Sequence, residues 1–315
     1  MTAELKMKVS TMKIIFMGTP EFAAESLENL YNVGHNIVGV FTQPDKPKNR
    51  GMKTTFSPVK LLAMNHNTPI YQPLTLKDDN IVNIIKELQC DLIVVVAYGK
   101  KIPNEILSIP PLGCINIHAS ILPKYRGASP IQHAIINGDT ETGVTSQYMS
   151  EEIDAGEILL VKKIAIDDND TSVDLFSKLS TLGAKLLIET ISAIETKTIM
   201  PTPQNENDVT YASLLTKDMS PIDWSKTAHE IKCMVRGLQP WPTATMILDE
   251  KTIKIFSVDI TSNKTSMIPG NIVSHGQNGI EIACSDGTVI IKELQAPGGK
   301  RMNAADFLKG NPIIT

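Results

Sequence analysis

Cysteine is scarce in this chain, and no two cysteines stand in a C-x-x-C pattern. The 315 residues include four of them, Cys90, Cys114, Cys233 and Cys284. This spacing suggests neither a zinc site nor a disulfide framework, so reduced thiols and no bound metal are the expectation. Cys114 stands two residues before Asn116 and could be considered as a nucleophile, but the role of a small apolar residue in a buried strand is favoured.

Long apolar runs are also missing. The longest, residues 92–97, is far too short to cross a bilayer and is typical of a buried parallel strand. Residues 1–11 lack the apolar core of a signal peptide and the Arg-rich character of a transit peptide, so we interpret them as a short extension. The true start is left open between Met1, Met7 and Met12, and a cytoplasmic location is expected.

Glycine-rich phosphate motifs are absent from the positions where they would be informative. Gly18 is the only glycine between Met12 and Val33, so the chain has no G-x-G-x-x-G after its first strand, and a nicotinamide cofactor is disfavoured. The G-x-x-x-x-G-K-[ST] pattern of ATP and GTP sites does not occur either. We expect Thr19 to cap the first helix and Pro20 to be its first residue.

An excess of positive charge is missing as well. The net charge of −4 argues against broad, nonspecific binding of nucleic acid, which depends on Lys and Arg near phosphates. Basic groups gather locally in residues 45–53, which carry Lys46, Lys48, Arg50 and Lys53 against one acidic residue. This segment is a candidate contact for nucleic acid, although a solvated surface loop would have the same composition.

The balance of 42% apolar and 20% charged residues is that of a soluble globular protein, and the length allows two domains. The first 165 residues alternate short apolar runs with helical patterns, which predicts an α/β fold with a doubly wound, Rossmann-like parallel sheet. The predicted strands are 13–17, 37–42, 92–97 and 114–117, and the predicted helices are 21–32, 58–65 and 80–89.

The pattern changes after a helical stretch from Ser172 to about Thr196. Residues 200–208 are polar and without period, as in a linker. Five short β-type runs follow at 244–248, 252–258, 272–274, 280–283 and 289–294, which predicts a small β-barrel. The expected organisation is an extension (1–11), a catalytic domain (12–197), a linker (198–213) and a C-terminal domain (214–315).

One stretch carries groups suited to acyl transfer. Asn116 and His118 are two residues apart at the end of a strand, so their side chains project to the same side, and Asp154 follows some 36 residues later. An amide can polarise a carbonyl group while an imidazole handles a proton. A single His or Asn is more often structural, but the aperiodic segment 120–130 that follows is a loop beyond a strand end, where α/β proteins place ligands.

These residues resemble a known family, the folate-dependent formyltransferases. The matching motifs are Asn116-Ile-His118, Ser120-Ile-Leu-Pro123, Tyr125-Arg-Gly-Ala128, Thr142-Gly-Val-Thr145 and Asp154-Ala-Gly156. Four further motifs are similar to the branch that formylates methionyl initiator tRNA: Met17-Gly-Thr-Pro-Glu-Phe22, Phe41-Thr-Gln-Pro-Asp45, Ile222-Asp-Trp224 and Trp241-Pro242. Ordered motifs spread over much of a chain are more specific than a lone pattern.

The resemblance implies transfer of the formyl group of 10-formyltetrahydrofolate to methionyl initiator tRNA by a monomer whose C-terminal barrel is of the OB type. It implies Asn116, His118 and Asp154 as catalytic residues. The implied folate contacts are Ser120, Ile121, Leu122, Pro123, Val96 and Tyr98, with the backbone near the last two meeting the pterin. The implied tRNA contacts are Lys46, Lys48, Arg50, Lys53, Lys300 and Arg301.

Other functions stay open on the sequence alone. The Asn, His and Asp set would equally serve a folate formyltransferase that acts on an amino sugar or a purine precursor, or a hydrolase that releases formate from the same folate. A catalytically silent tRNA-binding protein is the alternative from a different class, and folate-dependent turnover would distinguish it.

Overall fold

The computed structural model describes residues 12–48 and 53–313, which fall into two compact units. The first comprises the described residues up to Gly127 together with 143–163 and 176–211, and the second comprises 128–142, 164–175 and 212–313. The boundaries expected from sequence, 12–197 and 214–315, remain a prediction. Among the described residues, no helix is both long enough and apolar enough to cross a membrane.

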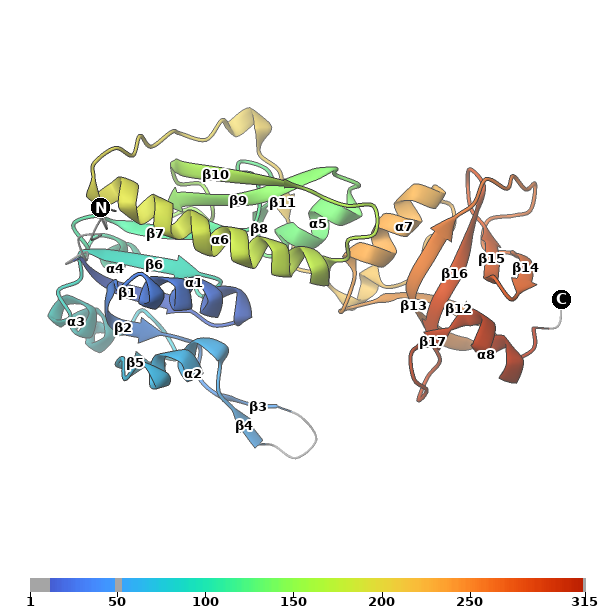
Figure 1. Cartoon of the computed structure of the whole chain (residues 1–315), viewed down its shortest axis with the longest axis horizontal. Coiled ribbons are helices and arrows are strands. Elements are labelled where there is room, and N and C mark those ends of the chain that lie inside the picture. The colour runs from blue at the N-terminus through green and yellow to red at the C-terminus, as the bar shows by residue number, and fades with distance from the viewer. Residues whose placement is uncertain (1–11, 49–52, 314–315) are drawn as a thin grey trace, which may run out of the picture. The chain divides into compact units, whose positions relative to one another are not determined.

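The first unit is built on a mixed, mostly parallel sheet with the spatial order β10-β9-β7-β6-β1-β2-β5 (Figure 1). Its strands are β1 (Lys13–Gly18), β2 (Asn36–Phe41), β5 (Ile70–Tyr71), β6 (Leu92–Val96), β7 (Cys114–His118), β9 (Glu141–Tyr148) and β10 (Ile158–Ala165). The first five run parallel to one another, while β9 pairs antiparallel to β7. Because the chain adds strands first on one side of β1 and then on the other, the doubly wound prediction is confirmed.

Helices cover both faces of this sheet. Apolar side chains of α3 (Asp79–Glu87) and α4 (Asn104–Leu107) share a buried cluster with β1 and β6. On the opposite face, α6 (Ser172–Glu195) approaches β7 so closely that a side chain at Gly183 would lie 3.1 Å from Ile117. The helices predicted at 21–32 and 58–65 match α1 (Glu21–Asn32) and α2 (Pro58–Asn65).

The predicted cap of α1 was wrong. Pro20 is the N-cap residue of α1 and makes no side-chain capping bond, and the helix starts at Glu21. The Thr19 hydroxyl instead donates to the carbonyl oxygen of Tyr98 at 3.4 Å and accepts from the backbone N–H of Gln43 at 3.3 Å. Thr19 therefore links the carboxyl ends of three neighbouring strands, an edge where α/β folds place ligands.

The basic segment, residues 45–53, contributes to a pair of antiparallel strands. Strands β3 (Lys46–Lys48) and β4 (Lys53–Thr55) pair antiparallel, and Arg50 lies outside the described residues. At its base, the Asp45 carboxylate accepts from Lys60 Nζ at 2.5 Å and from Gln72 Nε2 at 2.9 Å. These two hydrogen bonds hold the pKa of Asp45 below its usual value. Because Lys60 belongs to α2, its bond to Asp45 also ties the base of the hairpin to that helix.

The second unit contains an antiparallel sheet with the order β12-β13-β16-β15-β14 and a short strand β17 (Met302–Asn303) beside β16. Its main strands are β12 (Ala244–Leu248), β13 (Lys251–Ile260), β14 (Ile272–Gly276), β15 (Gly279–Ala283) and β16 (Thr288–Gln295). Each of the five predicted β-type runs falls on one of these strands. Their inward side chains form one core with α7 (Ala228–Gly237) and α8 (Ala304–Gly310).

The remaining elements are short. Within the segment expected to be irregular, β8 (Arg126–Gly127) is a two-residue strand that leads into α5 (Pro130–Ile136). The predicted linker contains the 3₁₀ turn η1 (Glu206–Asp208) and ends in β11 (Tyr211–Ala212), and η2 (Lys217–Met219) follows. The predicted linker is therefore partly structured.

Candidate active site

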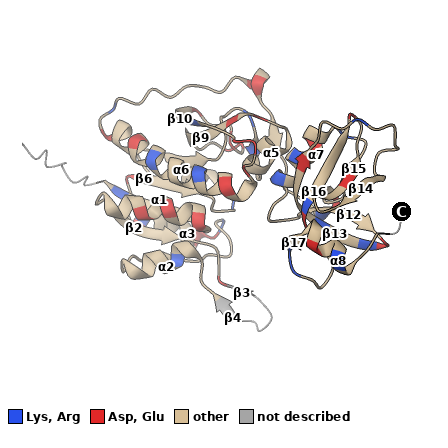
Figure 2. Cartoon of the chain, turned by 45° about the vertical axis from the view of Figure 1, so that its right-hand side comes forward, with Lys and Arg blue, Asp and Glu red and all other residues tan. Residues whose placement is uncertain are grey.

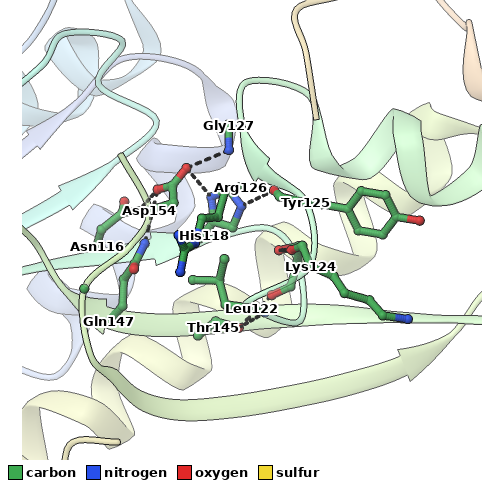
Figure 3. A network of polar contacts seen from close by, with 12 residues as sticks. Asn116, His118, Leu122, Lys124, Tyr125, Arg126, Gly127, Thr145, Gln147 and Asp154 are labelled. Carbon is green, nitrogen blue, oxygen red and sulfur yellow. Dashed lines mark hydrogen bonds and ion pairs between the residues drawn. The ribbon is translucent and has the colours of Figure 1, made fainter. Parts of the chain in front are cut away.

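Asn116 and His118 lie on one face of β7, as their spacing predicts. In the pairing with β9, Asn116 is opposite Gln147 and His118 is opposite Thr145. His118 is buried, whereas Asn116 is only partly buried. The two side chains come from a buried strand of the sheet, so the fold holds the amide and the imidazole at a fixed spacing (Figure 3).

Both ring nitrogens of His118 face oxygen atoms. The Nε2 atom lies 2.8 Å from the carbonyl oxygen of Tyr125, and because a carbonyl only accepts, Nε2 is the donor there. The Nδ1 atom lies 3.6 Å from the Oδ2 atom of Asp154, which is longer than a hydrogen bond. The imidazole is thus anchored through one nitrogen, with a carboxylate beside the other.

The Asp154 carboxylate is the centre of the polar network in Figure 3. Its Oδ2 atom accepts the backbone N–H of Gly127 at 2.9 Å, and its Oδ1 atom accepts from Gln147 Nε2 at 3.1 Å and from Asn116 Nδ2 at 3.4 Å. The Asp154 side chain is 12% exposed. Three N–H donors therefore satisfy the oxygens of this mostly buried carboxylate and hold it beside His118.

The turn between β9 and β10 brings Asp154 against the side chains of Asn116 and His118 on β7. The turn is closed by the N–H of Tyr148, which donates to the carbonyl oxygen of Glu157 at 2.9 Å. Asp154 itself adopts a left-handed backbone conformation with φ of 55°. Gly156 passes so close to β9 that an added Cβ would lie 1.7 Å from the Tyr148 carbonyl oxygen. Glycine is therefore required at this position.

The loop after β7 is held by Thr145 of β9 and by its own Ser120. Thr145 donates its hydroxyl hydrogen to the Ser120 carbonyl oxygen at 2.7 Å and accepts the Leu122 N–H at 3.1 Å. The Ser120 hydroxyl donates to the Lys124 carbonyl oxygen at 2.6 Å. These bonds fix the turn that carries Tyr125, the residue whose carbonyl oxygen anchors His118.

The residues expected to contact folate lie at this edge of the sheet, but most of their side chains are buried. Ser120, Leu122, Val96 and Tyr98 are each less than 5% exposed, and the Tyr98 hydroxyl is buried with no hydrogen-bond partner among the described residues. Because these side chains are buried, these residues can contact a ligand mainly through their backbone atoms. Ile121 and Pro123 are partly exposed.

The structure gives no cysteine the role of a nucleophile in the candidate active site. All four are free and buried. Burial, together with the neighbouring Cys90, raises the pKa of Cys114 to about 12. A thiol in this state is protonated near neutral pH, so Cys114 cannot act as a thiolate nucleophile. Across residues 12–48 and 53–313, no cluster of three or more His, Cys, Asp and Glu is arranged to hold a metal ion.

The candidate tRNA contacts come from two places in the sequence. Lys46, Lys48 and Lys53 belong to the β3–β4 hairpin, and Lys300 is exposed. Arg301 is already engaged, since it forms an ion pair with Glu293 and its guanidinium lies 4.6 Å from the centre of the Phe256 ring. Basic and acidic residues both occur on α6 (Figure 2), so this helix offers no surface of a single sign.

Two glutamines of the network were missed from sequence. Gln147 had a weak signal, because Thr145, Ser146 and Gln147 are consecutive polar residues in a strand of the predicted α/β fold, and the structure buries all three. Gln204 had none, because it lies in the aperiodic segment that was interpreted as a linker. Its amide nitrogen nevertheless lies 2.8 Å from the carbonyl oxygen of Asp154.

Solved structures of low sequence identity share this fold. An N-formyltransferase from Helicobacter canadensis, in complex with folinic acid and dTDP-3-aminofucose, is 21% identical with a TM-score of 0.68, covering 92% of this chain and 100% of that one. HypX from Aquifex aeolicus in complex with tetrahydrofolic acid is 18% identical with a TM-score of 0.65, covering 95% of this chain and 47% of that one. At such identities the likeness establishes the fold alone.

Sequence comparison is more specific. The family described as formyl transferase matches residues 12–191, and the formyl transferase C-terminal domain matches residues 214–312. The methionyl-tRNA formyltransferase of Alkaliphilus oremlandii is 48% identical over 302 residues, which is 96% of this chain and 97% of that protein. The enzyme of the same name from Clostridioides difficile is 43% identical over 304 residues, 96% and 98% of the two chains. The chain therefore belongs to the formyl transferase family, among the methionyl-tRNA formyltransferases.

Proposed function

We propose that this chain transfers the formyl group of 10-formyltetrahydrofolate to the α-amine of methionyl initiator tRNA, with Asn116, His118 and Asp154 as its catalytic residues. The observation that carries the assignment is their convergence: the amide and the imidazole share one face of β7, and the Asp154 carboxylate lies against both. Such a set suits a reaction in which a carbonyl oxygen gains negative charge while an amine loses a proton.

Asn116 supplies the hydrogen-bond donor for the formyl oxygen. Its Nδ2 group has two hydrogens, and the 3.4 Å contact with Asp154 uses one of them weakly. The amide is uncharged, so it needs no counter-ion at its partly buried position. As the amine attacks, negative charge develops on the formyl oxygen, and a fixed donor stabilises it more than it stabilises the neutral carbonyl.

His118 and Asp154 handle the proton. Transfer forms a bond between the amine nitrogen and the formyl carbon, breaks the bond from that carbon to N10, and moves one proton from the amine to N10. Nδ1 of His118 makes no hydrogen bond with Asp154 at 3.6 Å, so it is the ring nitrogen placed to exchange this proton. The carboxylate stabilises the imidazolium that forms, while the Tyr125 carbonyl fixes the ring through Nε2.

The folate is the formyl donor, and the residues at the end of β7 suit it. Tetrahydrofolate would lie along Ser120, Ile121, Leu122 and Pro123, with its pterin against the backbone at Val96 and Tyr98. The burial of four of these side chains supports recognition through backbone N–H and carbonyl groups. The formyl carbon would then lie beside Asn116.

The tRNA would be held by Lys46, Lys48, Arg50 and Lys53 of the hairpin segment, and by Lys300 and Arg301. The bonds of Asp45 to Lys60 and Gln72 support this assignment, because they anchor the residue from which the basic segment begins. For Arg301, contact with a phosphate would compete with its ion pair to Glu293. The protein would act as a monomer in the cytoplasm, and the chemistry needs no metal ion.

Transfer of labelled formyl from 10-formyltetrahydrofolate to charged initiator methionyl-tRNA tests this function. Uncharged tRNA, free methionine and an amino sugar nucleotide serve as parallel acceptors. Label on the charged tRNA alone is expected. Label on the sugar alone, or formate released with every acceptor, would replace the proposal with a sugar formyltransferase or a hydrolase, and unchanged folate would favour a silent binding protein.

A further inference from the structure

A side chain from the segment between the two family matches lies against the candidate active site. The Gln204 Nε2 group donates to the carbonyl oxygens of Asp154 at 2.8 Å and of Gly156 at 2.7 Å, and lies 3.3 Å from Gln147 Oε1. An amide nitrogen has two hydrogens, so the two short bonds take both, and the longer contact shares one of them. Gln204 thus bridges two carbonyl groups of the turn that presents the catalytic carboxylate.

The orientation of this amide is set by a charged neighbour. Arg126 donates from its Nε atom to Gln204 Oε1 at 3.0 Å, and an arginine can only donate. The Gln204 oxygen must therefore face Arg126, which leaves the NH₂ group facing the turn. Arg126 is 2% exposed.

Glu206 in turn holds Arg126. Its two carboxylate oxygens accept from the guanidinium at 2.7 Å and 3.3 Å. Burial alone would lower the pKa of Arg126, but the hydrogen bond and charge of Glu206, together with Tyr211, outweigh it and leave the pKa above its usual value. The same contact lowers the pKa of Glu206. Two charged residues thus fix the direction of the Gln204 amide.

The Asp154 turn needs such a hold. A residue other than glycine pays an energy cost for a left-handed backbone, and Asp154 has φ of 55°. The carboxylate is aimed at His118 only while this conformation persists. The bonds from Gln204 to the carbonyls on both sides of Ala155 oppose its relaxation. Gln147 adds a bond to the carboxylate itself at 3.1 Å.

We propose that Gln204 is a positioning residue for formyl transfer: by clamping the Asp154 and Gly156 carbonyls, it keeps the Asp154 carboxylate against His118 and Asn116. The inference rests on the proposed function, because it assigns a role within the same reaction. It also gives the segment joining the two family matches a part in catalysis rather than that of a passive connection.

Gln204→Met tests the proposal, since it keeps most of the side-chain volume and removes every hydrogen bond of the amide. We expect kcat to fall between about tenfold and a hundredfold, because a small misplacement of a catalytic group has effects of this size. The KM values for both substrates should stay within threefold of wild type. Asn207→Ala, an exposed amide on the same segment, is the matched control and should keep the wild-type kcat.

A double-mutant cycle separates positioning from general destabilisation. In an Asp154→Asn background, Gln204→Met should reduce kcat by less than threefold, because the group it positions is already lost. Gln204→Ala is carried through the same cycle, so that one unfolded variant, detected by its circular dichroism melting curve, does not decide the result. A wild-type kcat in folded Gln204 variants, or an equal loss with and without the Asp154 carboxylate, would overturn the proposal. Failure of the wild-type protein to formylate methionyl-tRNA would instead reject the proposed function.

Discussion

His118 and Asp154 face each other across 3.6 Å, from Nδ1 to Oδ2, while both are held by other groups. The ring is anchored to the Tyr125 carbonyl oxygen, and the carboxylate is anchored to the Gly127 N–H and to Gln147. The gap between them is therefore a property of the fold and not of a freely moving pair. A proton can enter this gap on Nδ1 and be stabilised by the carboxylate.

Replacing the Asp154 carboxylate should show how much it contributes to turnover. Asp154→Asn keeps the shape of the side chain but removes the charge that stabilises the imidazolium, so we expect turnover to fall at least about a hundredfold. Steady-state kinetics with both substrates saturating measures this. Glu152→Gln makes the same chemical change on an exposed residue of the same turn and should stay within twofold. Comparable losses in both variants would mean that the turn, and not the carboxylate, was disturbed.

Removal of the proposed oxyanion donor should act on rate and not on affinity. Loss of one such donor typically lowers turnover by about a hundredfold to a thousandfold, and we expect this for Asn116→Ala. The KM values should change little, because the donor stabilises charge that is absent from the bound substrates. Asn80→Ala, at an exposed amide of α3, is the control. A kcat of Asn116→Ala within threefold of wild type would remove Asn116 from this role.

The basic hairpin segment should matter for tRNA alone. Arg50→Ala is expected to raise the KM for methionyl-tRNA while leaving folate binding unchanged, and the effect should diminish at high salt because phosphate contacts are screened. Folate binding can be followed by fluorescence titration in the absence of tRNA. Lys185→Ala removes an exposed positive charge from α6 and serves as the control. Equal losses for both substrates would indicate misfolding instead.

A buried carboxylate of the second unit should make its stability depend on pH. Glu281 accepts from Thr288 at 2.6 Å, from Asn263 at 2.7 Å and from Ser274 at 2.7 Å, and these hydrogen bonds lower its pKa. A depressed carboxyl pKa stabilises the fold above the unfolded value of about 4.3, and this stabilisation is lost as pH falls through the folded pKa. Glu281→Gln loses one acceptor oxygen and should be about 1–3 kcal/mol less stable at pH 7.

Urea unfolding followed by tryptophan fluorescence measures this effect, because the two tryptophans, Trp224 and Trp241, both lie in the second unit. The difference between Glu281→Gln and wild type should be constant above about pH 5 and shrink below about pH 4.3. Glu250→Gln, at an exposed residue of the same unit, should show neither effect. A difference that is the same at all pH values would show that Glu281 contributes by packing alone.

Periodicity predicted most elements because each buries a regular apolar face. Residues 21–32 and 58–65 were matched by α1 and α2, and the strand at 244–248 by β12. The prediction that Thr19 caps α1 was wrong because the Thr19 hydroxyl bonds to a distant strand end, which no local capping pattern reveals. Gln204 was missed for the same reason: its partners lie some 48 to 78 residues earlier in the chain.

The most direct test compares wild type with His118→Ala in the transfer of labelled formyl to charged initiator methionyl-tRNA. We expect labelled N-formylmethionyl-tRNA from the wild-type protein and a rate at least about a hundredfold lower from the variant, with both substrates still bound. A wild-type protein that leaves the charged tRNA unlabelled, or a folded His118→Ala protein within threefold of its rate, would contradict it.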